Sequence, residues 1–468
     1  MADRLLFEPL HVVAEDVRER RVSPPELTEA ALRQVERWAP ALNPFITQTP
    51  EQARSMAHQA ERELAAGTYH GPLHGIPVVL KDLFETAGVR TTAGSPTLAN
   101  HLPERDATVV RRLREAGAVF IGKTGMPQFA EEPTSTNPFY GGVHNPWNLA
   151  YDSGGSSSGT AAAIAAGMAW CGPGSDTGGS IRIPSAACGL VGLKPTYGRV
   201  SLRGVLPLSI SVDHVGPMAR TVRDAALLLD VLTSYDPDDL CSREVPAQDD
   251  GPFDLDGGIH GLRVAALATD GGTVERDIAA AFVAGVTTLT QAGAIVEELA
   301  MPEMPEMIDA TEPLFVAEVF DHYGHLLAEH TDQIASNVRN TLGRGQRVTG
   351  AEAIAARRRL EHDLHQVERK LRGFDLLVSP TLALYPPPAG ERCLPLVRLT
   401  ALWNYAGWPA VSVPVGLSDE GLPIGFQIVA RPWREGLALR AARVIERTHA
   451  LDFPPLGLRA GQASQTGA

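Results

Sequence analysis

The sequence predicts an α/β fold, in which helices and short strands alternate in layers around one large core. Amphipathic helical patterns alternate with short apolar runs along most of the chain, which is typical of this class. The chain has 468 residues, of which 44% are hydrophobic, so it can bury a substantial core. No window approaches about eighteen uncharged apolar residues, the length that a membrane-spanning helix needs, so we expect no membrane partner.

Each predicted element follows from its own residue pattern. The first forty residues are amphipathic, and Ser23 is positioned to cap the second of two helices there. Residues 161–168 are small and apolar on all sides, so we expect a buried helix. The other predicted helices are 107–116, 221–232, 277–291 and 435–449, with a long helical stretch over 304–372. The predicted strands are 76–80, 118–121, 263–267, 295–299, 376–378, 410–415 and 424–429.

Composition and charge exclude several functional classes. The formal net charge of -14 argues against a general nucleic-acid binder, because such proteins present a basic face. The four cysteines are widely separated and form no CxxC pair, which predicts free thiols in a reducing compartment. The N-terminal residues lack an apolar stretch long enough for a signal peptide. We therefore expect a cytoplasmic protein that binds neither nucleic acid nor membrane.

Two motif matches lack the context that their chemistry needs. Residues 117–124 fit the phosphate-binding pattern GxxxxGK[ST], but their middle residues are Ala-Val-Phe-Ile, which predict a strand instead of an open loop. Residues 155–159 fit GxSxG, the nucleophile elbow of α/β-hydrolases, but a loop precedes them where that elbow needs a strand. We therefore interpret neither segment as a nucleotide site or as a hydrolase elbow.

Two glycine-rich segments indicate acyl-transfer chemistry. Ser156 lies in Gly-Gly-Ser-Ser-Ser-Gly, and Ser180 ends Gly-Ser-Asp-Thr-Gly-Gly-Ser. Glycine lets successive backbone N–H groups converge, so residues 177–179 can hold the oxyanion that forms when Ser180 attacks a carbonyl. The same pattern is also compatible with a tight turn in which Ser180 caps a helix and with a plain loop around Ser156.

A serine nucleophile needs a base, and Lys81 is the candidate. It follows the apolar run Val78-Val79-Leu80, where burial would lower its pKa and make the neutral amine accessible. Ser156 can then pass a proton between Ser180 and Lys81. Local sequence equally allows Lys81 to be an ordinary lysine at a strand end.

These segments resemble the amidase signature family. The densest match is GGSSSGTAAAIAAG, followed by GSDTGGSIRIPSAACGLVGLKPTYGRVS, HGIPVVLKDLF and NYAGWPAVSVPVG, and the resemblance covers nearly the whole chain. It implies one large α/β domain over 1–460 with a central twisted mixed sheet, helices on both faces and no cofactor or metal. Within that domain we expect N-terminal helices over 1–65, the signature core over 70–232 and a helical region covering the substrate over about 303–372. Residues 461–468 are expected to be a disordered tail.

The resemblance also implies roles for individual residues. Ser180 would be the acyl nucleophile, Ser156 a bridging serine preceded by a cis peptide bond, and Lys81 the base. The implied oxyanion hole consists of the backbone amides of Thr177, Gly178, Gly179 and Ser180, and the implied supporting residues are Ser157, Asp176 and Arg182. The implied reaction is hydrolysis of a carbon–nitrogen bond through an acyl-enzyme, with esters also cleaved.

One departure from the family guides the expected substrate. The branch that contains the A subunit of the Glu-tRNA(Gln) amidotransferase typically has Gln where this chain has Ile183. We therefore expect a stand-alone hydrolase, monomeric or homodimeric, acting on a small aromatic or alkyl amide, anilide or carbamate. The alternative is the glutaminase A subunit of that amidotransferase. Candidate substrate contacts are Met126, Phe129, Ala130, Ile183, Trp403 and Trp408, although aromatic residues are equally typical of cores.

Overall fold

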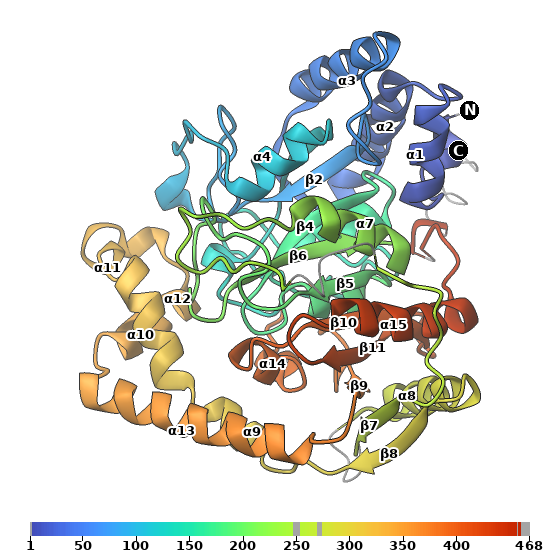
Figure 1. Cartoon of the computed structure of the whole chain (residues 1–468). Helices are drawn as coiled ribbons and strands as arrows, with labels where there is room; N and C mark the ends of the chain where they lie inside the picture. The colour runs from blue at the N-terminus through green and yellow to red at the C-terminus, as the bar shows by residue number, and fades with distance from the viewer. Residues whose placement is uncertain (1, 247–252, 269–273, 456, 460–468) are drawn as a thin grey trace.

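A mixed sheet of eleven strands forms the centre of the computed structural model (Figure 1). The structure describes residues 2–246, 253–268, 274–455 and 457–459. The strand order across the sheet is β1-β3-β2-β4-β6-β5-β10-β11-β9-β7-β8. The strands are β1 (Phe45–Gln48), β2 (Pro77–Lys81), β3 (Val119–Thr124), β4 (Cys171–Asp176), β5 (Val191–Lys194), β6 (His214–Ala219), β7 (Arg263–Leu267), β8 (Ile295–Leu299), β9 (Leu376–Pro380), β10 (Ala410–Leu417) and β11 (Pro423–Ala430).

Parallel pairs lie on both sides of a central run of antiparallel pairs in this sheet. Strand β2 runs parallel to β3 and β4, and β7 runs parallel to β8 and β9. The central strands β4, β6, β5, β10, β11 and β9 pair antiparallel in that order. Every residue of β2, β4 and β6 is buried, so the middle of the sheet is the centre of the core. The predicted α/β fold with a mixed sheet is confirmed.

Helices flank the sheet. Helices α7 and α15 pack on each other and on the central strands in front of the sheet in Figure 1. Helices α5 and α6 contact each other; α5 also packs on β2, β3 and β4, and α6 packs on β5, β10 and β11. The helices are α1 (Leu10–Arg18), α2 (Pro24–Leu42), α3 (Pro50–Ala65), α4 (Thr108–Glu115), α5 (Ser158–Ala165), α6 (Arg182–Ala187), α7 (Val222–Leu232), α8 (Arg276–Gln291), α9 (Met304–Asp309), α10 (Glu312–Tyr323), α11 (Leu326–Glu329), α12 (Ser336–Gly345), α13 (Gly350–Lys370), α14 (Leu402–Tyr405) and α15 (Glu435–His449).

Most predicted elements are present with small shifts of their ends. The predicted strand 118–121 is β3, and the long helical stretch predicted over 304–372 divides into α9 to α13. Ser23 caps α2, because its hydroxyl accepts a hydrogen bond from the Glu26 N–H. No helix in the described ranges is both long and apolar enough to cross a bilayer. The division into regions 1–65, 70–232 and 303–372 stays a prediction, and the tail 461–468 lies outside the described residues.

Three central strands, β4, β5 and β6, lie where the sequence pattern predicts none. Strand β4 reads Cys-Gly-Pro-Gly-Ser-Asp, which is the composition of a turn. Its glycines serve close packing instead. A Cβ at Gly172 would come within 2.5 Å of the Val79 carbonyl oxygen, and one at Gly174 within 2.8 Å of Ser157 Oγ. Tertiary contacts have therefore overridden the local preference of this segment.

Candidate active site

Lys81 ends strand β2 and is completely buried. Its Nζ donates hydrogen bonds to Ser156 Oγ at 2.7 Å and to Ser175 Oγ at 2.8 Å. Burial lowers the pKa of Lys81 from 10.5 to about 7, and the charges of Asp176 and Asp213 oppose that change. A buried amine with this pKa is partly neutral near neutral pH and can therefore accept a proton.

Ser156 lies in a loop that other parts of the chain hold closely. The Gly155–Ser156 peptide bond is cis. The Gly155 N–H donates to the Pro133 carbonyl at 2.8 Å, and the Gly154 N–H donates to Asp152 Oδ1 at 2.7 Å. A Cβ at Gly155 would lie 2.2 Å from the Thr134 carbonyl oxygen, so this position has room for glycine alone.

Ser180 lies in the turn between β4 and α6, next to the Ser156 loop. The Ser157 N–H donates to the Ser180 carbonyl at 3.2 Å, and Ser157 Oγ donates to the Ser175 carbonyl at 3.2 Å. Ser157 therefore links the two glycine-rich segments. The Ser180 hydroxyl has no hydrogen-bond partner among the described residues, and Ser180 lines a cavity together with Thr177 and Gly178.

Two buried polar contacts shape the turn that contains Ser180. Arg182 Nη2 lies 2.9 Å from Asp176 Oδ1, and both side chains are fully buried. Burial opposes the ionisation of Asp176, but the Arg182 guanidinium holds the pKa of that carboxyl well below its ordinary value. Thr177 Oγ1 donates to Asp213 Oδ1 at 2.6 Å, so a second carboxylate fixes the turn from the other side.

Several residues that hold this site were not among the predicted site residues. Ser175 is the second hydroxyl on Lys81, and Asp213 holds Thr177. Asn404 Nδ2 donates to the Asp176 carbonyl at 2.7 Å, and Gln427 Oε1 accepts from Arg182 Nη1 at 2.8 Å. Thr400 Oγ1 donates to the Gly178 carbonyl at 2.5 Å. Of these, Ser175 lies inside a glycine-rich segment and Asn404 begins the segment NYAGWPAVSVPVG, but neither side chain was predicted to take part in the site.

The cavity in front of Ser180 has a volume of about 260 Å³. Its wall combines apolar side chains with carboxyl groups. The lining residues are Ala130, Glu131, Glu132, Pro133, Thr177, Gly178, Ser180, Leu208, Ile308, Asp309, Thr311, Glu312, Phe315, Leu394, Val397, Ala401 and Tyr405. The predicted helical region over the substrate contributes the part from α9 and α10.

Of the six residues expected to contact substrate, the structure places Ala130 at this cavity. The other five pack in hydrophobic clusters. Trp403 and Trp408 stack on each other with ring centroids 6.1 Å apart. Phe129 stacks on Tyr323 at 4.0 Å, and Met126 belongs to the same main core. Ile183 is fully buried beneath Gly179, where its Cδ1 lies 2.7 Å from the place that a Gly179 Cβ would occupy.

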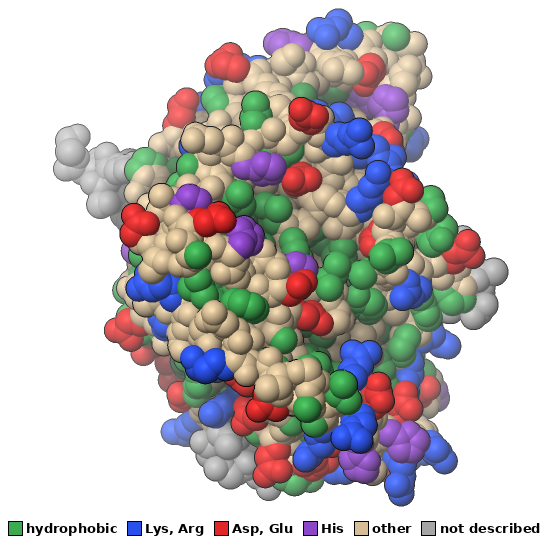
Figure 2. Space-filling model, turned by 90° about the vertical axis from the view of Figure 1, so that its left-hand side faces the viewer, with side chains coloured by type: hydrophobic (Ala, Val, Ile, Leu, Met, Phe, Trp, Pro, Cys, Tyr) green, Lys and Arg blue, Asp and Glu red, His purple; other side chains and the backbone are tan. Residues whose placement is uncertain are grey.

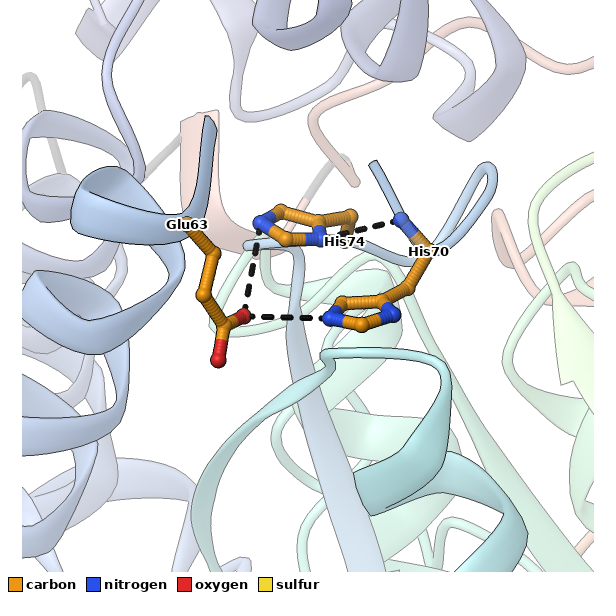
Figure 3. Close-up of side chains that lie close together, drawn as sticks. All are labelled: Glu63, His70 and His74. Carbon is orange, nitrogen blue, oxygen red and sulfur yellow. Dashed lines mark hydrogen bonds and ion pairs between the residues drawn. The ribbon is translucent and has the colours of Figure 1, made fainter. Parts of the chain in front are cut away.

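One group of side chains in the described part of the chain has a composition typical of metal sites, namely Glu63, His70 and His74 (Figure 3). His74 Nδ1 accepts from the His70 N–H at 3.2 Å, so its other nitrogen carries the proton and donates to the Ala60 carbonyl at 2.9 Å. The two rings are stacked with centroids 5.0 Å apart. Because the protein occupies both His74 nitrogens, we interpret this group as a structural one.

A family model described as Amidase matches residues 26–439. A protein from Carboxydothermus hydrogenoformans, named as the A subunit of glutamyl-tRNA(Gln) amidotransferase, is 35% identical over 93% of this chain and 96% of its own length. A protein of the same name from Pseudomonas entomophila is 38% identical over 92% of this chain and 95% of its own.

Solved structures of hydrolases are similar as well. A 6-aminohexanoate cyclic dimer hydrolase in complex with substrate has a TM-score of 0.87 and 30% identity, covering 96% of this chain and 99% of its own. A bacterial aryl acylamidase of the amidase signature family has a TM-score of 0.87 and 27% identity, covering 95% of this chain and 97% of its own.

These comparisons correct two expectations. The expected stand-alone hydrolase of small aromatic or alkyl amides is wrong, because relatives that match over nine-tenths of both chains are named as one component of an amidotransferase. The expected partners, a small molecule without nucleic acid and a monomer or homodimer, are wrong for the same reason. Ile183 misled the interpretation because it is a buried packing residue and not part of the cavity lining.

What remains common to the matching model, the relatives and the solved structures is an amidase-type enzyme on a single α/β domain. The match extends over most of the chain and includes the loops around both serines. The chain belongs to the amidase family.

Proposed function

We propose that this chain is the glutamine-hydrolysing A subunit of a Glu-tRNA(Gln) amidotransferase. The observation that carries the proposal is the name shared by relatives that align over nine-tenths of both chains. In this function the chain releases ammonia from an amide, and partner proteins of the complex bind the charged tRNA and use the ammonia. Because the proposed activity acts on aminoacyl-tRNA, we propose that the complex works in the cytoplasm.

The charge distribution is consistent with that division of work. The chain has a formal net charge of -14. On the side of the molecule where α10 to α12 lie, lysine and arginine side chains are interspersed with acidic ones around hydrophobic groups (Figure 2). On this face no continuous basic surface for tRNA phosphates is seen among the described residues.

In the proposed mechanism, Lys81, Ser156 and Ser180 form the catalytic triad. Neutral Lys81 accepts the proton of Ser156 across their 2.7 Å hydrogen bond, Ser156 takes the proton of Ser180, and Ser180 Oγ attacks the amide carbon. Thr177 to Ser180 supply the backbone N–H groups that stabilise the tetrahedral oxyanion. The supporting roles fall to Ser157, which ties the two loops, and to the Asp176–Arg182 pair.

The second half of the reaction reverses the proton path. Protonated Lys81 returns the proton through Ser156 to the amide nitrogen, the carbon–nitrogen bond breaks, and ammonia leaves. The acyl group stays on Ser180 as an ester. Water then loses its proton to the same relay and attacks this ester, which releases the carboxylic acid and restores the Ser180 hydroxyl.

The proposal is tested by exchanging the homologous chains. This chain replaces its relative in the amidotransferase of Pseudomonas entomophila, and conversion of Glu-tRNA(Gln) to Gln-tRNA(Gln) is measured with glutamine as the nitrogen donor. We expect conversion that requires the other components of the complex and disappears in Ser180→Ala. Ammonia release from other amides without any glutaminase activity, in the isolated chain and with partners, would contradict the proposal.

A further inference from the structure

The cavity in front of Ser180 is acidic. Four of its lining residues are carboxylic acids, Glu131, Glu132, Asp309 and Glu312, and none of the described lining residues is a lysine or an arginine. An arginine outside the lining, Arg344, lies 2.8 Å from Glu312 and partly balances it. A cavity of this composition favours a substrate that carries a positive charge.

In Glu132, one of the two carboxylate oxygens receives no hydrogen bond from the described residues. Its side chain is 1% exposed. One oxygen, Oε2, accepts a hydrogen bond from Arg392 Nε at 2.6 Å, while Oε1 is buried and has no hydrogen-bond partner among the described residues. A buried carboxylate oxygen without a donor is costly, and Glu132 is one of the residues that line the cavity, so a rotation of its side chain that turns Oε1 into the cavity would let a donor on the substrate satisfy it.

Both oxygens of the neighbouring Glu131 already accept hydrogen bonds, and this residue also lines the cavity. Its two oxygens accept hydrogen bonds from Thr341 Oγ1 and Asn337 Nδ2, each at 2.5 Å, and both donors lie on α12. Burial, together with the charge of Glu132, raises the pKa of Glu131 to about 7. A cation bound between these two carboxylates would therefore keep both of them ionised.

The chain connects this wall directly to the reacting centre. Glu132 precedes Pro133, whose carbonyl accepts the Gly155 N–H at 2.8 Å, and Ser156 follows Gly155. Glu132 and Ser180 also line the same cavity. A substrate that acylates Ser180 therefore occupies a cavity that Glu132 also lines.

We propose that Glu132 binds an ammonium group on the acyl part of the substrate through its free Oε1. The inference rests on the proposed function for the identity of the substrate, because the α-ammonium of glutamine supplies such a group. It adds that the α-carboxylate of glutamine receives no ion pair from the described residues of the cavity lining. The acidic wall then selects amides by their positive charge.

Three amides separate the contribution of the substrate's ammonium group from that of its α-carboxylate. They are L-glutamine, glutaramate, which is glutamine without its ammonium, and 4-aminobutanamide, which is glutamine without its α-carboxylate. For the wild-type chain in its complex, we expect kcat/KM to be at least about tenfold lower for glutaramate than for glutamine, and to be retained for 4-aminobutanamide. Equal kcat/KM for glutaramate and glutamine would overturn the inference.

Two variants distinguish ammonium binding from a structural role of Glu132. Glu132→Gln should raise KM for the two ammonium substrates about ten- to hundredfold, with little change for glutaramate. Arg392→Gln removes the ion pair but keeps the carboxylate, so it should retain the preference for ammonium substrates. If both variants lose activity equally on all three amides, Glu132 serves the fold and the inference fails. Glu298→Gln, an exposed position on β8, is the matched control.

The outcomes also separate this inference from the proposed function. Cleavage of 4-aminobutanamide but not of glutamine would support ammonium binding and contradict the glutaminase role. Cleavage of glutamine with no preference over glutaramate would support the glutaminase role and contradict ammonium binding. If a fluorophosphonate labels Ser180 and none of the three amides is cleaved, both proposals are wrong.

Discussion

The pH dependence of amide cleavage tests the proposed base most directly. Lys81 has a pKa of about 7 because burial disfavours its charged form. A pKa of 7 leaves about one half of Lys81 neutral at pH 7, about one in eleven at pH 6 and about one in a hundred at pH 5. Because only the neutral amine accepts a proton, kcat/KM should fall about fiftyfold from pH 7 to pH 5 and rise about twofold above pH 8.

The assay measures kcat/KM for butanamide between pH 5 and pH 9, normalised to the fraction of Ser180 that a fluorophosphonate labels. Butanamide carries no ammonium, so titration of Glu131 does not change its binding through charge. Asp213→Asn removes one of the two negative charges that raise the pKa of Lys81. The acidic limb should therefore move to lower pH, by up to about one unit. A flat profile, or a limb that moves to higher pH in Asp213→Asn, would refute Lys81 as the base.

Three substitutions test the surroundings of the site. Ser175→Ala removes one of the two hydroxyls on Lys81 and should lower kcat about tenfold with KM unchanged, as steady-state kinetics will measure. Gly155→Ala places a Cβ 2.2 Å from the Thr134 carbonyl oxygen, so it should lower the free energy of unfolding in urea by at least about 2 kcal/mol. An unfolding midpoint equal to that of the wild type would contradict the packing described. Arg182→Met leaves Asp176 buried without its charged partner and should lower the free energy of unfolding by about 3–5 kcal/mol. A smaller loss in the same urea measurement would mean that water enters the site.

Residues that share a segment were easier to predict than residues that meet across the sheet. Ser156 and Ser180 stand out because glycines surround them, and the structure brings their loops together through the Ser157 N–H. Ser175 contacts Lys81 from 94 positions away, and that contact depends on β2 lying beside β4. Since β4 has the composition of a turn, its place in the sheet has no local signal.

The substrate cavity was the least predictable part. Aromatic residues near the motifs were natural candidates, yet Trp403 and Trp408 fill a hydrophobic cluster of their own. The aromatic residues among the described cavity lining are Phe315 and Tyr405, and the wall also contains Glu131 and Glu132, two acidic residues that look like ordinary surface positions in the sequence. Their burial follows from the packing of α12 against this segment, which no pattern within the segment reports.

The proposed base depends on a balance between burial and nearby charge. Burial alone drives Lys81 toward the neutral form, and Asp176 and Asp213 draw it back toward the charged form. The charge of Asp176 is partly offset by Arg182, whose Nη2 lies 2.9 Å from Asp176 Oδ1. Asp213 has no such counter-ion in the contacts above, and although burial raises its pKa to about 6, about nine-tenths of it is ionised at pH 7. We infer that the Asp176–Arg182 pair keeps the pKa of Lys81 near 7 as well as fixing the turn, because an unmatched Asp176 would hold the lysine protonated and remove the base.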